Sequence, residues 1–351
     1  GLPPGQQVPI VEGNVLFGGT TGAGLAEWRI VPSPKKDQVK RVYVFATNPT
    51  IRRHSPPAPR AEATIDFDPG TGATGWPYSM YIASGNMAIY AIAGLYNTRT
   101  GTFEPYAMGL SRGVVAAPGD RLKVDVVVNI PFTEKVDVIL KNVPSDVDRH
   151  RVRLAISLGA DGYILRDDQQ VEGEGIPQTL SFGRLPRFTA PGLLDAFLAV
   201  DVTLDSAKNP TELPLLRATE TLLPARTKTV TLDDFIGAPR QVKPTPGALL
   251  QGNTLRWSHQ GARADLAITG IESPDQTPLW RIFAPGDTGE VKLPDPTTLG
   301  LPAWPKGPLV WLQWLVRLDP AYDYNTFNYT HMRSSYWTRW SFDQFSIIGP
   351  P

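Results

Sequence analysis

Four histidines are the first residues to test for chemistry, and they lie dozens of residues apart: His54, His150, His259 and His331. A zinc site usually takes ligands paired at short spacing, as in H-x3-H, and no such pair occurs. The chain has no cysteine, which excludes disulfides, thiolate metal ligands and a cysteine nucleophile. Residues 109–113 (GLSRG) have the spacing of a hydrolase nucleophile elbow. However, they lie in a predicted hairpin and not in a strand-to-helix turn. We therefore predict no catalytic residues and no enzyme activity.

Carboxylates leave two alternatives open. Glycosidases use two carboxyl groups roughly 5–10 Å apart, and the sequence singles out no such pair. Asp66 and Asp68 stand in the run DFDPGTG, which resembles part of a calcium loop, but Gly70 occupies the position where a third ligand belongs. We interpret this run as a polar turn and keep calcium as the alternative; no other cofactor is predicted.

A second weak calcium candidate is the carboxylate group near the C-terminus. It comprises Asp319, Asp323 and Asp343, with Asn325 nearby.

The most unusual stretch is the aromatic-rich segment 322–345, in which Tyr and Trp alternate with Asp, Asn, Arg and Thr. Such amphipathic rings are enriched at surfaces that are dry on one side and wet on the other. The residues that a protein or glycan partner would contact are Tyr322, Tyr324, Tyr336, Trp337 and Trp340. The simpler interpretation, which we favour, is a long loop folded against the last strand, because aromatic residues also favour sheets.

The Pro- and Gly-rich residues 1–13 form the second candidate contact region. Val8, Pro9, Ile10 and Val11 have the character of a short strand that could add to a sheet edge of a neighbouring molecule. Docking within the same chain is the alternative.

Composition restricts the class of protein. Lys+Arg and Asp+Glu both number 34, so the basic excess typical of nucleic-acid binders is missing and we predict no nucleic-acid partner. No run approaches the roughly 20 apolar residues that span a bilayer. The Pro/Gly-rich leader is typical of the region after an export cleavage site or a lipid-anchored residue. We predict an exported bacterial protein of the cell surface.

The elements expected around these residues are short strands. Pro 35 and Gly 32 are scattered as turn residues between apolar runs, and helical periodicity is sparse. Residues 122–128 show a two-residue period, with Leu122, Val124, Val126 and Val128 on one face. Helices are expected only at 190–198 or 232–236. The predicted strands are 42–46, 63–67, 78–82, 87–94, 122–128, 136–140, 151–158, 196–204, 255–258, 264–269, 279–283 and 309–318.

Composition shifts divide the chain after the leader. We predict an N-terminal extension (1–13) and three antiparallel β-sandwich domains (14–135, 136–238 and 239–351), so the fold class is all-β. The second boundary is marked by the Pro/Gly-rich residues 237–247 (GAPRQVKPTPG).

Two of these domains resemble known families. Residues 78–94 (YSMYIASGNMAIYAIAG), with Gly85 at a turn, and residues 103–113 (FEPYAMGLSRG) resemble a carboxypeptidase regulatory-like domain. That resemblance implies a seven-stranded transthyretin-type sandwich without an active site. Residues 255–258 (LRWS) are similar to the early strand of a fibronectin type III or immunoglobulin-like domain. In that family an early-strand Trp fills the core, and Trp257 takes this place here.

Together these observations predict a non-catalytic structural or adhesive protein of the cell surface. A more specific version is a filament subunit that assembles by strand addition through residues 1–13. The alternatives are a carbohydrate-binding surface protein and a glycan-active enzyme with a dispersed carboxylate pair.

Overall fold

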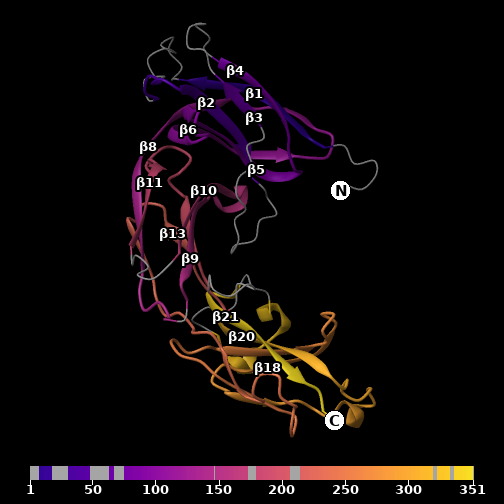
Figure 1. Cartoon of the computed structure of the whole chain (residues 1–351). Helices are drawn as coiled ribbons and strands as arrows, with labels where there is room; N and C mark the ends of the chain where they lie inside the picture. The colour runs from indigo at the N-terminus through magenta and orange to yellow at the C-terminus, as the bar shows by residue number, and fades with distance from the viewer. Residues whose placement is uncertain are drawn as a thin grey trace.

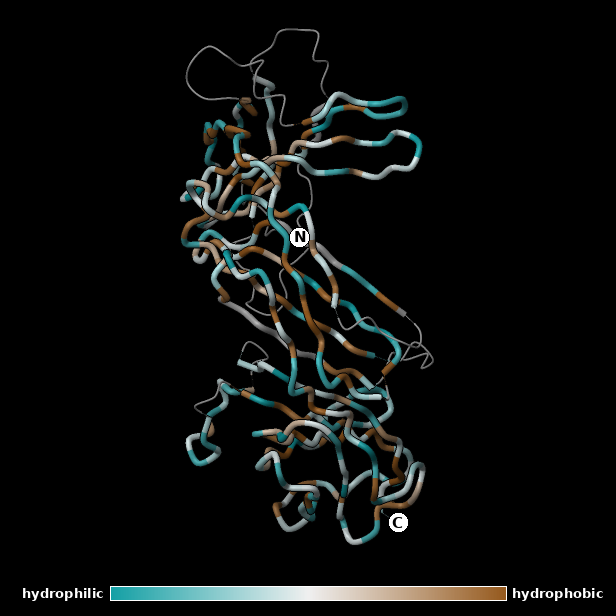
Figure 2. Tube along the Cα trace, turned by 90° about the vertical axis from the view of Figure 1, so that its left-hand side faces the viewer, coloured by the Kyte–Doolittle hydropathy of each residue, from teal (hydrophilic) through white to brown (hydrophobic). Residues whose placement is uncertain are grey.

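The computed structural model describes residues 8–17, 31–47, 63–66, 75–145, 147–172, 179–205, 214–318, 322–332, 336–350, and side chains at most of these. Its elements are β-strands and short 3-10 turns, as the predicted all-β class requires. Three units follow one another along a curved arc (Figure 1), and apolar strands run through the interior of each (Figure 2). Neither helix expected at 190–198 or 232–236 forms; these residues are turns, the start of a strand and extended chain.

The first unit is a strongly curved sheet in the order β3-β2-β5-β6-β8-β1-β4, with β7 paired to β1. Its strands are β1 (Ile10–Phe17), β2 (Gln38–Ala46), β3 (Ala63–Asp66), β4 (Gly75–Tyr81), β5 (Gly85–Asn97), β6 (Phe103–Ala116), β7 (Arg121–Lys123) and the first part of β8 (Val126–Leu140). The sheet encloses a core that contains Val11, Val15, Met87 and Ile89. Gly85, predicted at a turn, has φ 123° at the start of β5.

The middle unit is a sandwich of two sheets. The second part of β8 pairs with β11 and β14, and this sheet faces the sheet β10-β9-β12-β13. Its further strands are β9 (Arg149–Ser157), β10 (Tyr163–Glu172), β11 (Thr179–Pro186), β12 (Phe197–Asp205), β13 (Leu215–Pro224) and β14 (Thr229–Leu232). The shared core includes Leu140, Leu154 and Phe182.

The C-terminal unit packs the sheet β21-β20-β17-β18 on a three-stranded sheet, β15-β16-β19. Its strands are β15 (Arg240–Lys243), β16 (Thr254–Ser258), β17 (Leu266–Glu272), β18 (Pro278–Pro285), β19 (Glu290–Lys292), β20 (Pro308–Arg317) and β21 (Arg339–Ile348). Trp257 is 3% exposed between the two sheets, edge-on to Trp311 at 6.4 Å, as its predicted core position requires.

Both predicted domain boundaries fall on continuous structure. The boundary between residues 135 and 136 lies inside β8, whose Val126 and Val128 enter the first core while Val136 and Val138 enter the middle core. The second boundary is bridged by β13, which pairs with β21 and joins the sheets of the middle and C-terminal units. The expected linker at 237–247 contains strand β15, paired with β16.

The position of β5 between two cores explains why its sequence is continuously apolar. Met87, Ile89 and Ala91 point into the core of the first unit, whereas Tyr90 and Ile92 point into that of the middle unit. A strand buried on both faces has no polar face and therefore loses the alternation of a surface strand. The first and middle units are thus two layers packed on opposite faces of one sheet.

Candidate functional site

The C-terminal aromatic residues form a layer on the face of the C-terminal sheet opposite Trp257. They pack around Leu266, Ile268, Val316 and Leu318 of β17, β20 and the residue that follows β20. The half-buried rings in this layer are Tyr322, Tyr324, Phe327, Trp337 and Trp340, with Phe283 and Trp314 of the sheet. This is the arrangement that the simpler interpretation predicted, namely a loop folded against the sheet.

Polar atoms within this layer are directed inward. The Tyr324 hydroxyl donates to the carbonyl oxygen of Phe283 at 2.9 Å, and the Trp337 indole donates to the carbonyl oxygen of His331 at 2.9 Å. The Tyr322 hydroxyl is buried and finds no hydrogen-bond partner in the described parts of the chain. Its burial, together with Tyr324, Asp265 and Asp323 nearby, raises the pKa of Tyr322 to about 12. Tyr322, Tyr324 and Trp337 are primarily packing residues.

Two tyrosines of the same segment remain available to a partner. Tyr336 is 45% exposed and Tyr329 is 78% exposed. Of the five predicted contact residues, only Tyr336 is therefore exposed, and Tyr329 was not among them.

The N-terminal candidate residues lie inside the first unit. Strand β1 pairs with β4 on one side and with β7 and β8 on the other. Val11 is fully buried, and the carbonyl oxygen of Pro9 accepts from the backbone N–H of Ile82 at 3.0 Å. Because β1 is already paired within the chain on both of its edges, strand addition through Val8, Pro9, Ile10 and Val11 is corrected to docking within the chain.

Gly13 shows why β1 fits there. A Cβ atom at this position would come within 1.8 Å of the carbonyl oxygen of Val124, where the chain crosses between β7 and β8. Residues 124 and 125 belong to neither strand, so the predicted strand 122–128 is divided between β7 and β8. Leu122, Val124 and Val126 nevertheless all face the core of the first unit.

The candidate calcium ligands are only partly described. Asp66 ends β3 without a described side chain, and Asp68 and Asp319 lie outside the described residues. Asp323 accepts from the backbone and side-chain N–H groups of Asn325, both at 2.9 Å, and thereby caps a 3-10 turn. Asp343 accepts from the backbone of Gln344 at 2.8 Å. Among the described residues, no three acidic or histidine side chains gather as metal ligands do.

The buried carboxylates of the middle unit serve as ion-pair partners. Asp205 pairs with Arg149, and Asp201 lies 3.7 Å from Arg153. Both carboxylates are on β12, four residues apart, which separates them by about 13 Å along a strand. This exceeds the roughly 5–10 Å that glycoside hydrolysis requires.

Ser111 lies in the middle of β6, paired with Ile89 of β5. A nucleophile elbow needs a sharp turn between a strand and a helix, and a serine within a strand lacks that geometry.

His150, one of the four histidines considered first in the sequence, is a buried polar residue. It is fully buried on β9, between Val171 of β10 and Leu204 of β12, on the same face as Val152 and Leu154. Neither ring nitrogen has a hydrogen-bond partner in the described part of the structure. Burial therefore lowers the pKa of His150, because the charged imidazolium would have nothing to compensate its lost hydration.

We expect the fold to lose stability in mild acid because of His150. Below the ordinary histidine pKa of about 6.5, the unfolded chain binds a proton that the folded chain does not. The free energy of unfolding then falls by up to about 1.4 kcal/mol per pH unit. Urea unfolding at pH 7.5 and 5.5 measures this loss. His150→Leu should reduce the difference, whereas His259→Leu at a more exposed site should not; equal losses in all three proteins would contradict the prediction.

The junction between the first and middle units centres on Arg112 of β6. Its Nε donates to Asp161 at 2.8 Å, and its terminal nitrogens donate to Asp195 and to the carbonyl oxygens of Leu158 (2.9 Å) and Gly192 (3.1 Å). Arg112 holds the pKa of Asp195 below its usual range. One side chain of the first unit thus holds two turns of the middle unit.

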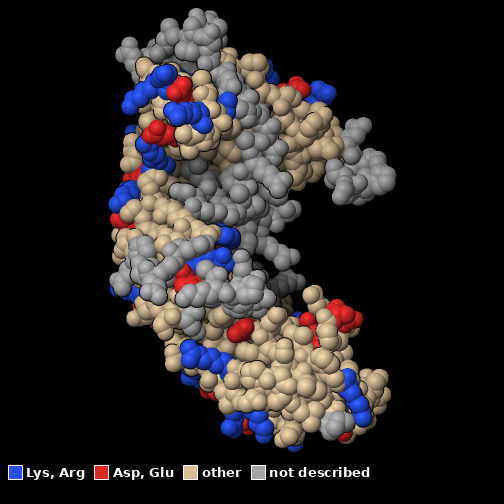
Figure 3. Space-filling model, viewed as in Figure 1, with Lys and Arg blue, Asp and Glu red and all other residues tan. Residues whose placement is uncertain are grey.

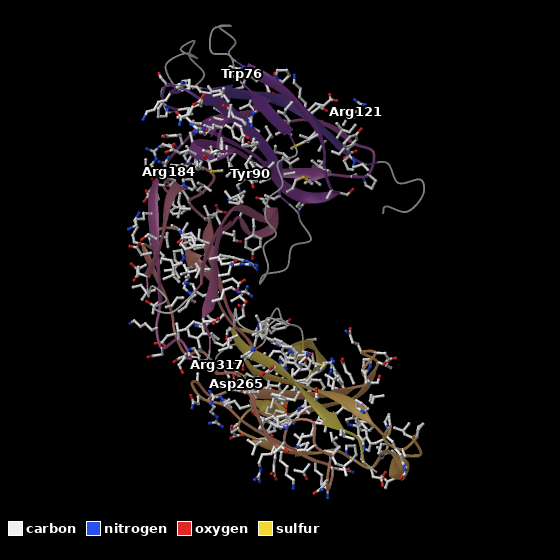
Figure 4. The ribbon with its side chains drawn as sticks, viewed as in Figure 1. Trp76, Tyr90, Arg121, Arg184, Asp265 and Arg317 are labelled. Carbon is white, nitrogen blue, oxygen red and sulfur yellow. The ribbon has the colours of Figure 1, made fainter. Side chains whose placement is uncertain are left out.

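Arg184 of β11 adds a second contact at this junction (Figure 4). Its guanidinium pairs with Glu104 of β6 and lies 5.1 Å from the ring centroid of Tyr106.

The junction between the middle and C-terminal units is also held by several contacts, and Figure 4 labels Arg317 among their residues. Ser341 of β21 is fully buried and donates to the carbonyl oxygen of Gly237 at 3.0 Å. Arg339 donates to the carbonyl oxygen of Asp233 at 2.9 Å, and Arg317 pairs with Asp234 at 3.2 Å. The sequence did not identify Arg112, Arg317 or Ser341 as junction residues, since isolated polar residues in strands carry no local signal.

Comparison with known proteins gives weak similarity only. No family model and no curated protein matches the sequence. Among solved structures, trypsin-activated alpha-2-macroglobulin from Escherichia coli is 10% identical, with a TM-score of 0.16, covering 89% of this chain and 21% of that one. Sidekick-1 immunoglobulin domains 1–5 are 11% identical, with a TM-score of 0.15, covering 88% of this chain and 52% of the other. The chain thus spans about a fifth and about half of these two structures.

Proposed function

We propose that this chain is a non-catalytic structural or adhesive protein of the cell exterior that acts as a rigid spacer. The observation that carries the proposal is that its three units share strands or sheets. Strand β5 is buried by two cores, β8 runs from one core into the next, and the β13–β21 pair makes one sheet of two units. A shared strand cannot act as a hinge without breaking a core or a sheet.

The polar contacts at the junctions favour the same function. Arg112 and Arg184 fasten the first unit to the middle unit, and Arg317, Arg339 and Ser341 fasten the middle unit to the C-terminal unit. Domains joined by flexible linkers move relative to one another by default. Here the junctions between units consist of shared cores and a shared sheet, as inside a single domain. Such junctions suit a protein that transmits force or holds two partners at a fixed distance.

The absence of enzyme activity remains part of the proposal. It is supported by what the carboxylates do: Asp161, Asp195, Asp201 and Asp205 are all engaged by arginines. No helix in the described residues is long and apolar enough to cross a membrane. We propose protein contacts or self-association as the mode of action, independent of cofactors and nucleic acid.

Carbohydrate binding is the second candidate function. Exposed Tyr329 and Tyr336 favour it, because aromatic rings can stack on sugar faces. The half-buried positions of Trp337 and Trp340 leave these indoles less suited to that role than the sequence suggested.

Two measurements test the proposed function. Protease treatment of intact native cells should digest this chain while cytosolic markers survive; recovery of the intact chain in the cytosolic fraction would refute the location. Small-angle X-ray scattering should give one profile that matches the arc of Figure 1 across a wide range of salt concentration. A profile that needs an ensemble of bent and straight forms would refute the rigid spacer.

A further inference from the structure

A pocket of about 250 Å³ opens at the far end of the C-terminal unit, away from the aromatic layer. It is formed by the start of β18, a 3-10 turn (Pro296–Leu299) and the loop that leads to β20. The residues that line it are Leu279, Trp280, Pro296, Leu301, Pro302, Ala303, Trp304 and Pro305. None of them is charged, and Figure 3 shows that this unit has a broad uncharged surface.

Two indoles form the wall of this pocket. The rings of Trp280 and Trp304 lie 6.1 Å apart at 62°. The Trp304 indole N–H is already used, since it donates to the carbonyl oxygen of Pro294 at 3.0 Å. The Trp280 indole N–H has no hydrogen-bond partner among the residues described. One ring is therefore fixed, and the other offers a free donor beside an apolar surface.

The rim of the pocket is stiff and apolar. Three prolines line it, and Leu299 and Leu301 next to it are 58% and 48% exposed. The volume is below the roughly 300–1,000 Å³ of sites that enclose small molecules. The pocket is therefore suited to part of an extended ligand that continues across the surface.

We propose that this pocket binds an uncharged, proline-rich peptide in the polyproline II conformation. Surfaces lined by aromatic residues recognise such peptides because the prolyl rings pack against the aromatic faces and the peptide is already ordered. Polyproline II leaves its carbonyl oxygens without internal hydrogen bonds, and the Trp280 N–H would donate to one of them. The uncharged lining matches a peptide without charged side chains.

A β-strand is a less suitable occupant of this site. Strand β18 is the outer strand of its sheet, but prolines occupy both of its ends, Pro278 and Pro285. The Tyr324 hydroxyl also occupies the carbonyl oxygen of Phe283 on this strand. Prolines and capped backbone groups protect an edge against strand addition.

The test uses the full chain and a blocked synthetic peptide, APPAPPAPPA, followed by tryptophan fluorescence and calorimetry. Saturable binding is expected, and AGGAGGAGGA of the same length should not bind. Trp304→Ala should weaken binding at least tenfold. Trp280→Phe keeps the ring but removes the N–H donor, and should weaken binding about three- to tenfold.

Trp76→Phe in the first unit is the matched control, because Trp76 is also half-buried and edge-on to a neighbouring ring, Phe17, at 5.2 Å. It should leave the affinity unchanged. Circular dichroism and thermal unfolding verify that each variant is folded. Absence of peptide binding by the folded parent, binding unaffected by both pocket variants, or binding of neutral oligosaccharides in place of the peptide would overturn the proposal. None of these outcomes bears on the rigid-spacer function, which rests on other residues.

Discussion

Replacement of Arg112 by alanine should destabilise the junction between the first and middle units by about 2–3 kcal/mol. The substitution removes four interactions at once and leaves Asp161, whose side chain is only 14% exposed, without its cation. Removing one partner of a buried ion pair costs about 3–5 kcal/mol. The 23% exposure of Arg112 lowers this expectation, because water can reach part of the site.

Hydrogen exchange measured by mass spectrometry locates the effect of Arg112→Ala. Peptides that cover residues 158–163 and 187–196 should exchange faster, whereas peptides from β16 and β20 should not change. The control is Arg121→Ala, which breaks an exposed pair with Glu12 in the same unit and should cost less than about 1 kcal/mol. Similar effects of the two substitutions would mean that Arg112 does not fasten the units.

Tyr90→Ala should cost still more than Arg112→Ala, about 3–5 kcal/mol of unfolding free energy. Tyr90 is fully buried in β5 and stacks on Phe45 at 4.8 Å, at the point where the first unit meets the core of the middle unit (Figure 4). The cavity left by the missing tyrosine ring would lie between the first and middle units. Both units should therefore lose protection against hydrogen exchange together.

Two variants distinguish this shared effect from a local one. Tyr90→Phe keeps the ring and should retain most of the stability. Tyr81→Ala removes a tyrosine that is 68% exposed on β4 of the same unit and should change the stability by less than about 1 kcal/mol. If Tyr90→Ala weakened only the first unit, the two units would be independent domains and the spacer would contain a hinge.

The shared strands and the β13–β21 pair are the physical basis of the stiffness that we propose. A bend at either junction would expose apolar surface of β5 or separate β13 from β21. Arg112 at one junction and Ser341 at the other add hydrogen bonds that depend on orientation. Stiffness is consequently expected to depend on the junction residues more than on the separate cores.

The polyproline proposal places the contact site at the opposite end of the arc from the first unit (Figure 1). A rigid body would hold a peptide bound in the pocket of Trp280 and Trp304 at a fixed distance from β1. The two proposals are compatible, although each has its own test.

The sequence alone determined the kind of structure and much of the excluded chemistry. Short apolar runs bounded by turn residues predicted the strands. Residues 151–158 alternate with a two-residue period, which specifies a sheet face locally, and residues 309–318 are a nearly continuous apolar run. The missing cysteines excluded thiol chemistry. Trp257 was identified as a core residue, and the aromatic segment was expected to fold against the last strand.

Only the tertiary structure decided how the parts share their interiors. The sequence of β5 shows that both faces are apolar, but not that Tyr90 and Met87 enter different cores. Residues 10–17 have the same pattern whether they pair within the chain or with a neighbour, and Arg112 has no partner within its own strand. Periodicity records the environment of each residue, whereas partners far apart in the chain are chosen by the packing of whole sheets. The junctions, the place of β1 and the pocket of Trp280 and Trp304 all depend on that packing.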